Sequence, residues 1–291
     1  MLRLVLPKGS LERATLDLFS SADLAVERSS EVDYRAKIDD PRIDEVRILR
    51  PQEIPRYVAE GLFDFGITGR DWIEETDSDV VSLGELHYSK ATSRPIKVVL
   101  AVPATSPIVK ASELKDGIRV STEYPNLTAK YFEKLGVKAE VLLSYGATEA
   151  KVPDIADAVV EITETGRAIR AAGLKIVETI LVSNTELIAN PKSAQDPIKL
   201  HAMEQILTLL TGTLAARDSV LVKLNVGSAD LGKVIAELPS MKSPTVSQLF
   251  GGEGFAVEAV VPRNTINTLI PSLKDHGASD ILEIPLSKIV P

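Results

Sequence analysis

The segment from Asp157 to Arg167 constrains the fold of this chain more than any other part of its sequence. The apolar residues Val159, Val160 and Ile162 predict a strand that enters a hydrophobic core. A turn rich in hydroxyl groups and glycine follows, and residues 168–173 are typical of a helix. A strand, a tight turn and a helix in direct succession indicate an α/β protein.

The chemistry of this turn suggests a ligand. Thr163, Thr165 and Gly166 place hydroxyl and backbone N–H groups where the helix is expected to begin, and the free N–H groups of a helix N-terminus attract phosphate. Asp157 and Glu161 precede the turn, and we expect them to hold sugar hydroxyls or a hydrated metal ion. A phosphorylated ribose would satisfy both halves of the pattern. The alternative is an ordinary strand–turn–helix junction with a threonine N-cap and solvated acids.

The composition is that of a globular protein of two or three domains. The 291 residues are 44% hydrophobic and 25% charged, which is enough apolar material to bury large cores. No apolar run reaches the roughly 18 residues of a membrane span, and the N-terminus lacks the apolar region of a signal peptide, so we expect a cytoplasmic protein. Cysteine is absent, which excludes disulfides, thiolate metal sites and cysteine nucleophiles. The net charge of −8 with dispersed basic residues argues against nucleic acid as a partner.

Basic residues follow the strands that are expected near the N-terminus. Lys8 comes after the apolar residues 2–6, and Arg50 ends the strand expected at residues 45–50. Ser10 is expected to cap the helix that contains Arg13. Open α/β sheets bind ligands at the carboxyl ends of their strands, so an anion could bind here. The alternative is a set of surface side chains in loops.

The strand–turn–helix rhythm occurs in two series, which predicts two lobes. Residues 96–102 begin the second series after a crossover expected at Thr92 to Pro95, and residues 175–188 are typical of extended segments that return to the first lobe. We therefore expect lobe I to comprise residues 1–91 and 177–215, and lobe II residues 92–176. Ligands favour the cleft between two such lobes.

The C-terminal part follows a different pattern. Residues 216–291 predict the order β-α-β-β-α-β of a ferredoxin-like domain, with Asn264 capping its second helix. Ser243, Thr245 and Asp280 lie at expected strand starts, where an effector could bind between subunits. The alternative is that they are ordinary turn residues.

Together these segments resemble ATP phosphoribosyltransferase, the first enzyme of histidine biosynthesis, in the long form that carries a C-terminal regulatory domain. The resemblance covers essentially the whole chain and depends on the order and spacing of several short motifs. They are Leu6-Pro7-Lys8-Gly9-Ser10, Leu49-Arg50-Pro51, Asp64-Phe65-Gly66-Ile67-Thr68-Gly69-Arg70-Asp71, Tyr124-Pro125-Asn126, Ala156-Asp157-Ala158 with Glu161, Thr165-Gly166-Arg167 and Ser243-Pro244-Thr245.

This resemblance implies a two-lobed catalytic part like that of periplasmic binding proteins, a ferredoxin-like (ACT-like) C-terminal domain, and a homo-hexamer with a dimer as its smaller unit. It implies that the adenine N1 of ATP attacks C1 of phosphoribosyl pyrophosphate (PRPP), giving phosphoribosyl-ATP and pyrophosphate. Mg²⁺ would accompany the pyrophosphate, and histidine would act as a feedback inhibitor.

The resemblance also implies a role for particular residues. Asp157 and Glu161 would hold the PRPP ribose, Lys8 and Arg50 would face pyrophosphate or the ATP phosphates, and these four are the catalytic candidates. The expected PRPP-binding residues are Asp157, Glu161, Thr163, Glu164, Thr165, Gly166, Arg167 and Ala168. The expected ATP-binding residues are Lys8, Gly9, Arg13, Arg50, Asp71 and Tyr124. Histidine would bind around Asn225, Ser243, Thr245 and Asp280, and no side chain is assigned to Mg²⁺.

The sequence departs from the family pattern in three places. Glu161 stands where aspartate is common, the loop between Glu149 and Ile155 is one residue short, and Asn225 stands where some members place an acid that could meet the histidine amino group. Two other interpretations remain open from the residues alone: a two-lobed small-molecule sensor, and a C-terminal domain that serves assembly only. No Gly-x-Gly-x-x-Gly turn follows an expected strand, which argues against a nicotinamide dehydrogenase.

Overall fold

The computed structural model describes residues 1–88, 94–239, 241 and 243–290. The chain divides into two compact units, Met1–Ser20 with Leu24–Leu207, and Ser21–Asp23 with Thr208–Pro291. The division falls inside helix α7 (Pro197–Arg217), whereas the sequence pattern predicts a boundary at residue 216. The first unit contains two sheets and the second contains one.

The first sheet of the first unit forms lobe I. Its seven strands lie in the spatial order β2 (Val26–Glu27), β3 (Arg35–Ile38), β4 (Ile43–Leu49), β1 (Leu2–Pro7), β5 (Phe65–Gly69), β12 (Thr185–Ala189) and β6 (Val81–Leu86). Strand β1 pairs parallel with both β4 and β5, and nearly all of its residues are buried, as expected for a strand covered on both faces. The carboxyl ends of β1, β4 and β5 therefore lie at one edge of the sheet.

Helices α1 (Glu12–Ser21), α2 (Ile54–Ala59), α3 (Arg70–Thr76) and α6 (Pro191–Gln195) accompany this sheet, together with the first part of α7. Helix α1 begins at Glu12, one residue later than a cap at Ser10 requires, so that prediction is wrong. The Gly9 N–H instead donates to the Glu12 carboxylate at 3.1 Å, and the Glu12 N–H donates to the Gly9 carbonyl at 3.1 Å. This reciprocal pair closes the turn without the serine hydroxyl.

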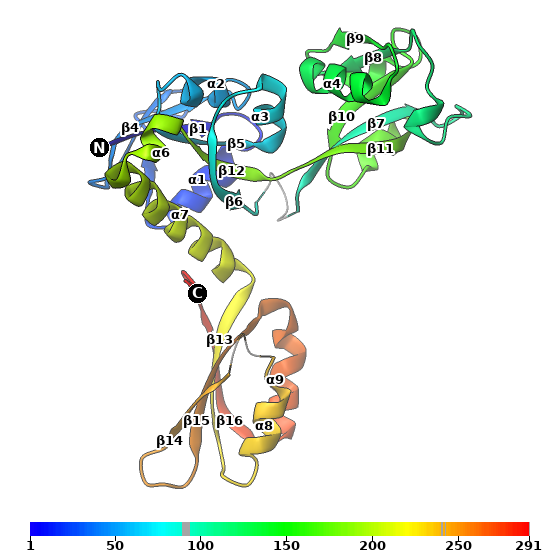
Figure 1. Ribbon diagram of the computed structural model, residues 1–291. Coiled ribbons are helices and arrows are strands. Elements are labelled where there is room, and N and C mark those ends of the chain that lie inside the picture. The colour runs from blue at the N-terminus through cyan, green and yellow to red at the C-terminus, as the bar shows by residue number, and fades with distance from the viewer. Residues whose placement is uncertain (89–93, 240, 242, 291) are drawn as a thin grey trace. The chain divides into compact units, whose positions relative to one another are not determined.

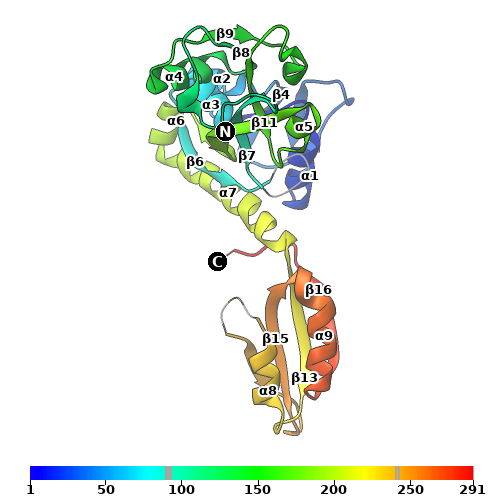
Figure 2. The ribbon, with the colours of Figure 1, turned by 90° about the vertical axis from the view of Figure 1, so that its right-hand side faces the viewer.

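The second sheet of the first unit forms lobe II. Its strands lie in the order β11 (Leu174–Ser183), β7 (Ile96–Pro103), β10 (Ala158–Thr163), β8 (Arg119–Thr122) and β9 (Glu140–Leu143). Strands β10, β8 and β9 pair in parallel. At the other side of the sheet, β7 pairs antiparallel with both β10 and β11. The helical segments are η1 (Ala111–Glu113), α4 (Pro125–Leu135), η2 (Thr148–Lys151) and α5 (Arg167–Ala171), and α4 lies against β9 (Figure 2).

The lobes are joined by chain segments that cross between the sheets. Strand β11 of lobe II continues through Asn184 into β12 of lobe I (Figure 1). Residues 177–183 therefore belong to the sheet of lobe II, whereas the sequence placed the return to lobe I at residue 177. Residues 92 and 93 of the other predicted crossover lie outside the described part of the chain. The two-lobed α/β arrangement expected from the sequence is confirmed.

The second unit is a four-stranded antiparallel sheet with helices on one face. Its strands lie in the order β14 (Thr245–Gln248), β15 (Phe255–Pro262), β13 (Ser219–Val226) and β16 (Ala278–Pro285). The helical segments are α8 (Leu231–Glu237), η3 (Arg263–Thr265) and α9 (Ile266–Asp275). The order of strands and helices confirms the ferredoxin-like prediction. Thr265, and not Asn264, occupies the N-cap position of α9, so the predicted cap is wrong by one residue.

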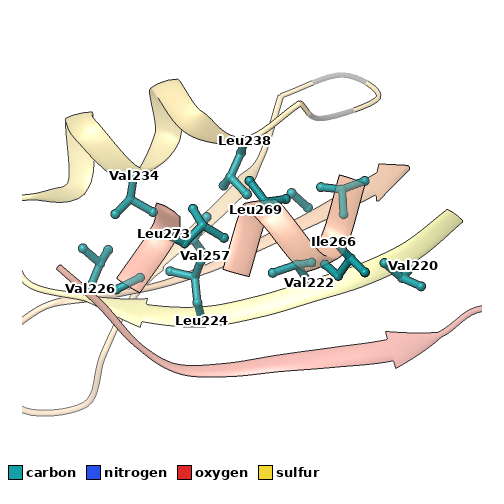
Figure 3. Close-up of a cluster of buried hydrophobic side chains, with 13 residues drawn as sticks. Val220, Val222, Leu224, Val226, Val234, Leu238, Val257, Ile266, Leu269 and Leu273 are labelled. Atoms are coloured by element: carbon teal, nitrogen blue, oxygen red, sulfur yellow. The ribbon is translucent and has the colours of Figure 1, made fainter. Parts of the chain in front are cut away.

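The core of the second unit follows from the alternation along β13. Val220, Val222, Leu224 and Val226 are buried, and the residues between them face the opposite side of the sheet. Val234 of α8 and the apolar residues of α9 cover the buried face (Figure 3). Among the described residues, no helix combines the length and the apolar character needed to cross a membrane.

Candidate functional site

A cavity of about 520 Å³ lies between the two lobes of the first unit. It opens at the carboxyl ends of the parallel strands of both sheets, where α/β proteins bind their ligands. Lobe I contributes Ser10, Leu11, Pro51, Gln52, Gly69, Asp71 and Trp72, lobe II contributes Ile96, Glu123, Tyr124, Ile162, Thr163 and Glu164, and the connecting segments contribute Tyr88, Arg94, Pro95, Ser183, Asn184 and Thr185.

A buried polar cluster forms one wall of this cavity. The Tyr124 hydroxyl donates to one Asp71 carboxylate oxygen at 2.7 Å, and the Ser183 hydroxyl donates to the other at 2.6 Å. Trp72 stacks on Tyr124 with ring centroids 4.5 Å apart. Burial raises the pKa of Asp71, and burial beside that carboxyl raises the pKa of Tyr124 well above its usual value. Asp71 and Tyr124, both predicted to lie near ATP, therefore reach the cleft but bind each other.

A second contact between the lobes lies behind this wall. Glu75 of α3 accepts hydrogen bonds from the Asn126 N–H at 3.1 Å and the Leu127 N–H at 2.9 Å, at the start of α4. The Asn126 side chain donates in return to the Glu75 carbonyl at 3.1 Å. Glu75 is a buried carboxylate, and this burial raises its pKa. Helix α3 of lobe I thus satisfies N–H groups of a helix in lobe II.

The predicted cations of lobe I lie beside the cavity. Lys8 and Gly9 directly follow β1, Arg50 directly follows β4, and their neighbours Ser10 and Pro51 line the cavity. A Cβ at Gly9 would lie 3.9 Å from the Arg50 guanidinium, so these two predicted residues are brought together.

Arg13 is placed differently from the other predicted ATP-binding residues. Its side chain is 95% exposed and its guanidinium lies 3.9 Å from Asp17 on the same face of α1. An exposed pair of this kind contributes little energy. The structure does not bring Arg13 to the cavity wall.

The predicted phosphate turn lies at the cavity in lobe II. Thr163 and Glu164 line it, and the turn continues through Thr165 and Gly166 into α5, which begins with Arg167 and Ala168. The Gly166 N–H donates to the Thr163 hydroxyl at 2.8 Å, and the Arg167 N–H lies 3.4 Å from the Thr165 hydroxyl. Gly166 occupies the N-cap position of α5 with φ of +71°.

Glu161 lies two residues before this turn, and its environment favours the neutral carboxyl. Burial raises the pKa of Glu161, and the nearby carboxylates of Glu123 and Glu149 raise it further, against hydrogen bonds from the Ile162 N–H and Thr148. A carboxylate held in such a place interacts strongly with any positive charge that forms beside it. Glu161 is not itself among the residues that line the cavity, whereas the adjacent Ile162 and the nearby Glu123 are, so its contact with a ribose stays a prediction.

Asp157 is placed apart from the phosphate turn. Asp157 precedes the first residue of β10, whereas the phosphate turn follows the last, and a strand of six residues separates its ends by about 20 Å. The Arg119 backbone N–H donates to Asp157 at 2.9 Å and its guanidinium donates at 2.8 Å. Arg119 lowers the pKa of Asp157 by these bonds. Asp157 is a structural partner of Arg119 and is not brought beside the phosphate turn, and its contact with the PRPP ribose stays a prediction.

Comparisons with known proteins agree with this architecture. A family described as ATP phosphoribosyltransferase matches residues 50–212, and one described as the HisG C-terminal domain matches residues 216–288. The ATP phosphoribosyltransferase of Chlorobaculum parvum is 45% identical over 290 residues, which cover 100% of this chain and 98% of that protein. The protein of the same name from Pelotomaculum thermopropionicum is 46% identical over 292 residues, covering 100% and 99%. The chain belongs to the ATP phosphoribosyltransferase family.

A solved structure shows the same relationship. A chain of the ATP phosphoribosyl transferase (HisG:HisZ) complex from Thermotoga maritima aligns with a TM-score of 0.62 and 27% identity. The alignment covers 72% of this chain and 97% of that one. The full-length relatives and the match to the C-terminal domain identify the long form of the ATP phosphoribosyltransferase family.

In this member of the ATP phosphoribosyltransferase family, the residues predicted to bind histidine lie in two separate places within one chain. The Asn225 amide donates to the Asp280 carboxylate at 3.0 Å, because β13 and β16 are neighbours. Thr245 belongs to β14, and Ser243 lies just before this strand. β14 and β16 are the two edge strands of the sheet, about 14 Å apart. The structure therefore does not bring the four predicted residues together within one chain.

A preformed metal cage is absent from the part of the chain that the structure describes. No group of three or more His, Asp or Glu side chains there has the arrangement to hold a metal ion. His87 lies 3.9 Å from Glu85 and is mostly exposed, and His201 lies beside Gln205 on the surface of α7. His276 contacts the Ser272 carbonyl at the end of α9.

Several residues that line or support the cavity were not predicted from the sequence. Trp72 and Ser183 position Asp71 and Tyr124, yet neither belongs to a recognisable motif. The polar run Ser183-Asn184-Thr185 does interrupt two apolar extended segments, and that interruption is the signal that could have located it. Glu75 carries no comparable signal, because a glutamate on a short helix usually faces solvent.

Proposed function

We propose that the cavity between the two lobes transfers the phosphoribosyl group of PRPP to N1 of the ATP adenine, releasing pyrophosphate, in the first step of histidine biosynthesis. The observation that carries this proposal is the full-length similarity at 45% identity to a protein named for that reaction. The position of the cavity supports it, since it lies between the basic strand ends of lobe I and the hydroxyl-rich turn of lobe II.

The charges on the two sides of the cavity suit the reaction. As the bond between C1 and the pyrophosphate oxygen breaks, positive charge develops on the ribose and negative charge on the leaving group. Glu161 would stabilise the ribose, and residues 163–168 would bind its 5′-phosphate. Lys8 and Arg50 would stabilise the pyrophosphate or the ATP phosphates. Fixing both substrates in one cavity supplies much of the remaining acceleration.

The buried wall has a different role in this proposal. Asp71 and Tyr124 are each only 2% exposed and bind each other, so they would shape the nucleotide pocket more than they contact the adenine. Trp72 and Ile162 also line the cavity and supply apolar surface to it. An apolar and aromatic lining with few polar groups is typical of nucleotide pockets.

Mg²⁺ is proposed to arrive with the pyrophosphate group of the substrate. Because no cluster of acids among the described residues could hold the ion alone, phosphate oxygens and water would supply most of its ligands. When bound, the ion would neutralise part of the charge on the leaving pyrophosphate.

The decisive experiment is a turnover assay with purified full-length protein. ATP, PRPP and Mg²⁺ are mixed with a pyrophosphatase, and phosphate release and phosphoribosyl-ATP formation are followed together. We expect two phosphates for each phosphoribosyl-ATP, because the pyrophosphatase splits each pyrophosphate into two, and neither product when ATP or PRPP is omitted. Binding of either substrate without turnover would overturn the proposal in favour of a two-lobed sensor.

Histidine inhibition and a hexamer built from dimers are also proposed. The match to the HisG C-terminal domain supports them, as does the placement of Asn225 and Asp280 on one edge strand pair with Ser243 and Thr245 at the other. The solved relative from Thermotoga maritima is a complex of two kinds of chain, so it supports no particular assembly here. Histidine titrations and the molar mass in solution test both statements.

A further inference from the structure

Lys8 is held at the edge of lobe I by its backbone and by one aromatic ring. The Lys8 N–H donates to the Leu49 carbonyl at 2.6 Å, which fixes the residue between the ends of β1 and β4. The Lys8 ammonium nitrogen lies 3.9 Å from the centroid of the Tyr34 ring. This distance is well within the range of a cation–π interaction.

Tyr34 is itself fixed, although its ring is not part of a core. It directly precedes β3, and its carbonyl accepts a hydrogen bond from the Ile48 N–H of β4 at 2.9 Å. The side chain nevertheless remains 54% exposed. Hydrophobic burial therefore accounts for only part of its placement, and the contact with Lys8 is a further interaction of the ring.

The ring differs from the usual partner of a lysine in one respect. Among the described residues, no carboxylate pairs with Lys8 or Arg50, whereas Arg47 of β4 and Arg42 just before β4 each pair with an acid. A carboxylate would restrain the ammonium but would also cancel its charge toward an incoming anion. The face of a neutral ring attracts the ammonium and leaves its net charge in place.

We propose that Tyr34 is a positioning residue, which holds the Lys8 ammonium in place for a pyrophosphate or triphosphate group. This inference rests on the proposed function, in which Lys8 faces such an anion. Tyr34 acts only through Lys8 and does not touch the reacting atoms. A lysine side chain has four rotatable bonds, so restraining it before the anion arrives lowers the entropy cost of binding.

The test compares two substitutions of Tyr34 in the full-length protein. Tyr34→Leu removes the ring but keeps an apolar side chain, and Tyr34→Phe keeps the ring and removes only the hydroxyl. Pyrophosphate binding is measured by calorimetric titration, together with KM and kcat. We expect Tyr34→Leu to weaken pyrophosphate binding about two- to fivefold, the loss of one cation–π contact at an exposed site. Tyr34→Phe should retain most of the binding.

A double-mutant cycle with Lys8→Met separates positioning from a merely structural role. In the Lys8→Met background the ring has no ammonium to hold, so Tyr34→Leu should then change pyrophosphate binding by less than about 1.5-fold. Melting temperatures show whether either variant perturbs the fold. The inference is overturned if Tyr34→Phe is as impaired as Tyr34→Leu, or if the loss persists without Lys8.

The two proposals fail in different ways. If the wild-type protein binds pyrophosphate but forms no phosphoribosyl-ATP, the proposed reaction is wrong, and the calorimetric titration alone decides the role of Tyr34. A wild-type protein that turns over while Tyr34→Leu binds pyrophosphate normally would keep the reaction and remove the role of Tyr34. Absence of pyrophosphate binding in an active wild-type protein would also remove it.

Discussion

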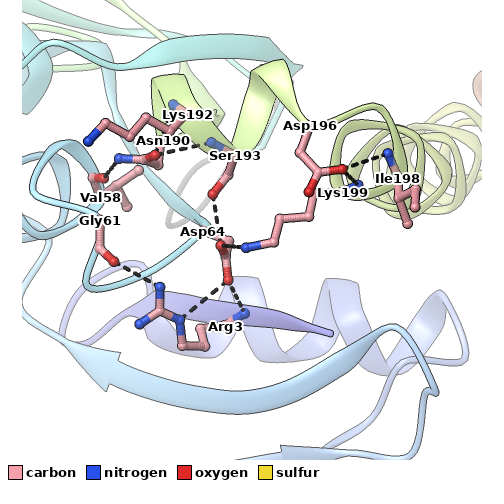
Figure 4. Close-up of polar contacts among 10 residues, drawn as sticks. All are labelled: Arg3, Val58, Gly61, Asp64, Asn190, Lys192, Ser193, Asp196, Ile198 and Lys199. Atoms are coloured by element: carbon pink, nitrogen blue, oxygen red, sulfur yellow. Dashed lines mark hydrogen bonds and ion pairs between the residues drawn. The ribbon is translucent and has the colours of Figure 1, made fainter.

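Asp64 ties three elements of lobe I together through one carboxylate (Figure 4). It accepts the backbone N–H of Arg3 in β1 at 2.8 Å, the Ser193 hydroxyl of α6 at 2.8 Å and the Lys199 ammonium of α7 at 2.7 Å. Burial alone would raise the pKa of Asp64, but these donors outweigh it and lower the pKa to about 2. The carboxylate is therefore ionised, buried and fully paired.

This pairing predicts a stability that depends on pH. The unfolded state has the higher pKa and takes up its proton first, so the contribution of Asp64 is complete above about pH 4 and disappears as the pH falls toward 2. The shift corresponds to roughly 2 kcal/mol. In urea unfolding, the difference in free energy between wild type and Asp64→Asn should shrink over this interval. A difference independent of pH would contradict the assignment.

The two acids of the 157–167 segment are predicted to behave differently from each other. Asp157→Asn should leave kcat within about twofold of wild type and lower the unfolding free energy by about 1 kcal/mol, since its ion pair with Arg119 is half-exposed. Glu161→Gln should lower kcat more than about tenfold, because in the proposed reaction it removes the carboxyl group that would stabilise the charge on the ribose. Steady-state kinetics on both variants measures this. A large loss in Asp157→Asn alone would support the assignment made from sequence.

At the scale of elements, the contact between α3 and α4 determines how the lobes meet. Glu75 accepts two N–H groups at the start of α4, where a negative charge is also favoured by the helix dipole. Asp71 and Trp72 of the same helix contact Tyr124, the residue before α4. Three side chains of one short helix therefore hold one end of another.

Removing this contact should affect stability and substrate binding together. Glu75→Ala leaves the Leu127 N–H buried without an acceptor, which costs about 1–3 kcal/mol, and it should raise KM for both substrates. Glu75→Gln retains an acceptor oxygen and should lose less. Glu74→Ala, at a half-exposed position that pairs with Arg70, serves as the control and should change stability by about 0.5 kcal/mol or less. Thermal unfolding and KM measurements that show equal effects at both positions would contradict this role.

Strands were easier to predict than helix starts, for a physical reason. The apolar runs at residues 2–6, 96–102 and 158–163 became β1, β7 and β10, because short apolar runs rich in β-branched residues and bounded by turns are typical of strands that enter a core. The predicted caps at Ser10 and Asn264 were each off by one residue. A cap depends on which of several local polar groups reaches a free N–H group, and adjacent residues compete closely for that position.

At the scale of the whole molecule, the C-terminal unit is predicted to connect histidine to the cavity. Asp280 has φ of +49°, and its carboxylate accepts the Asn225 amide, which leaves acceptor capacity toward an amino group. Asp280→Asn should therefore weaken histidine inhibition by about tenfold or more, the loss expected for a charge-assisted bond, while kcat without histidine stays unchanged. Unaltered inhibition in Asp280→Asn would indicate that the unit serves assembly only.

The sequence by itself determined the family, the two-lobed catalytic part and the ferredoxin-like unit. Hydrophobic periodicity and short motifs are local properties that every stretch of the chain carries, and their order along the chain is sufficient for these conclusions. The hydroxyl-rich turn at residues 163–166 was predicted for the same reason, since strand, turn and helix are adjacent in sequence.

Only the tertiary structure decided which side chains share a site. Asp157 and Glu161 are four residues apart, yet the extended strand sends Asp157 toward Arg119 and away from the phosphate turn. The partners of Asp71, Tyr124 and Ser183 come from three distant segments, and the Tyr34 ring meets Lys8 only because β3 and β1 flank β4. Such contacts depend on strand order and chain direction, which the spacing of residues along the sequence does not contain.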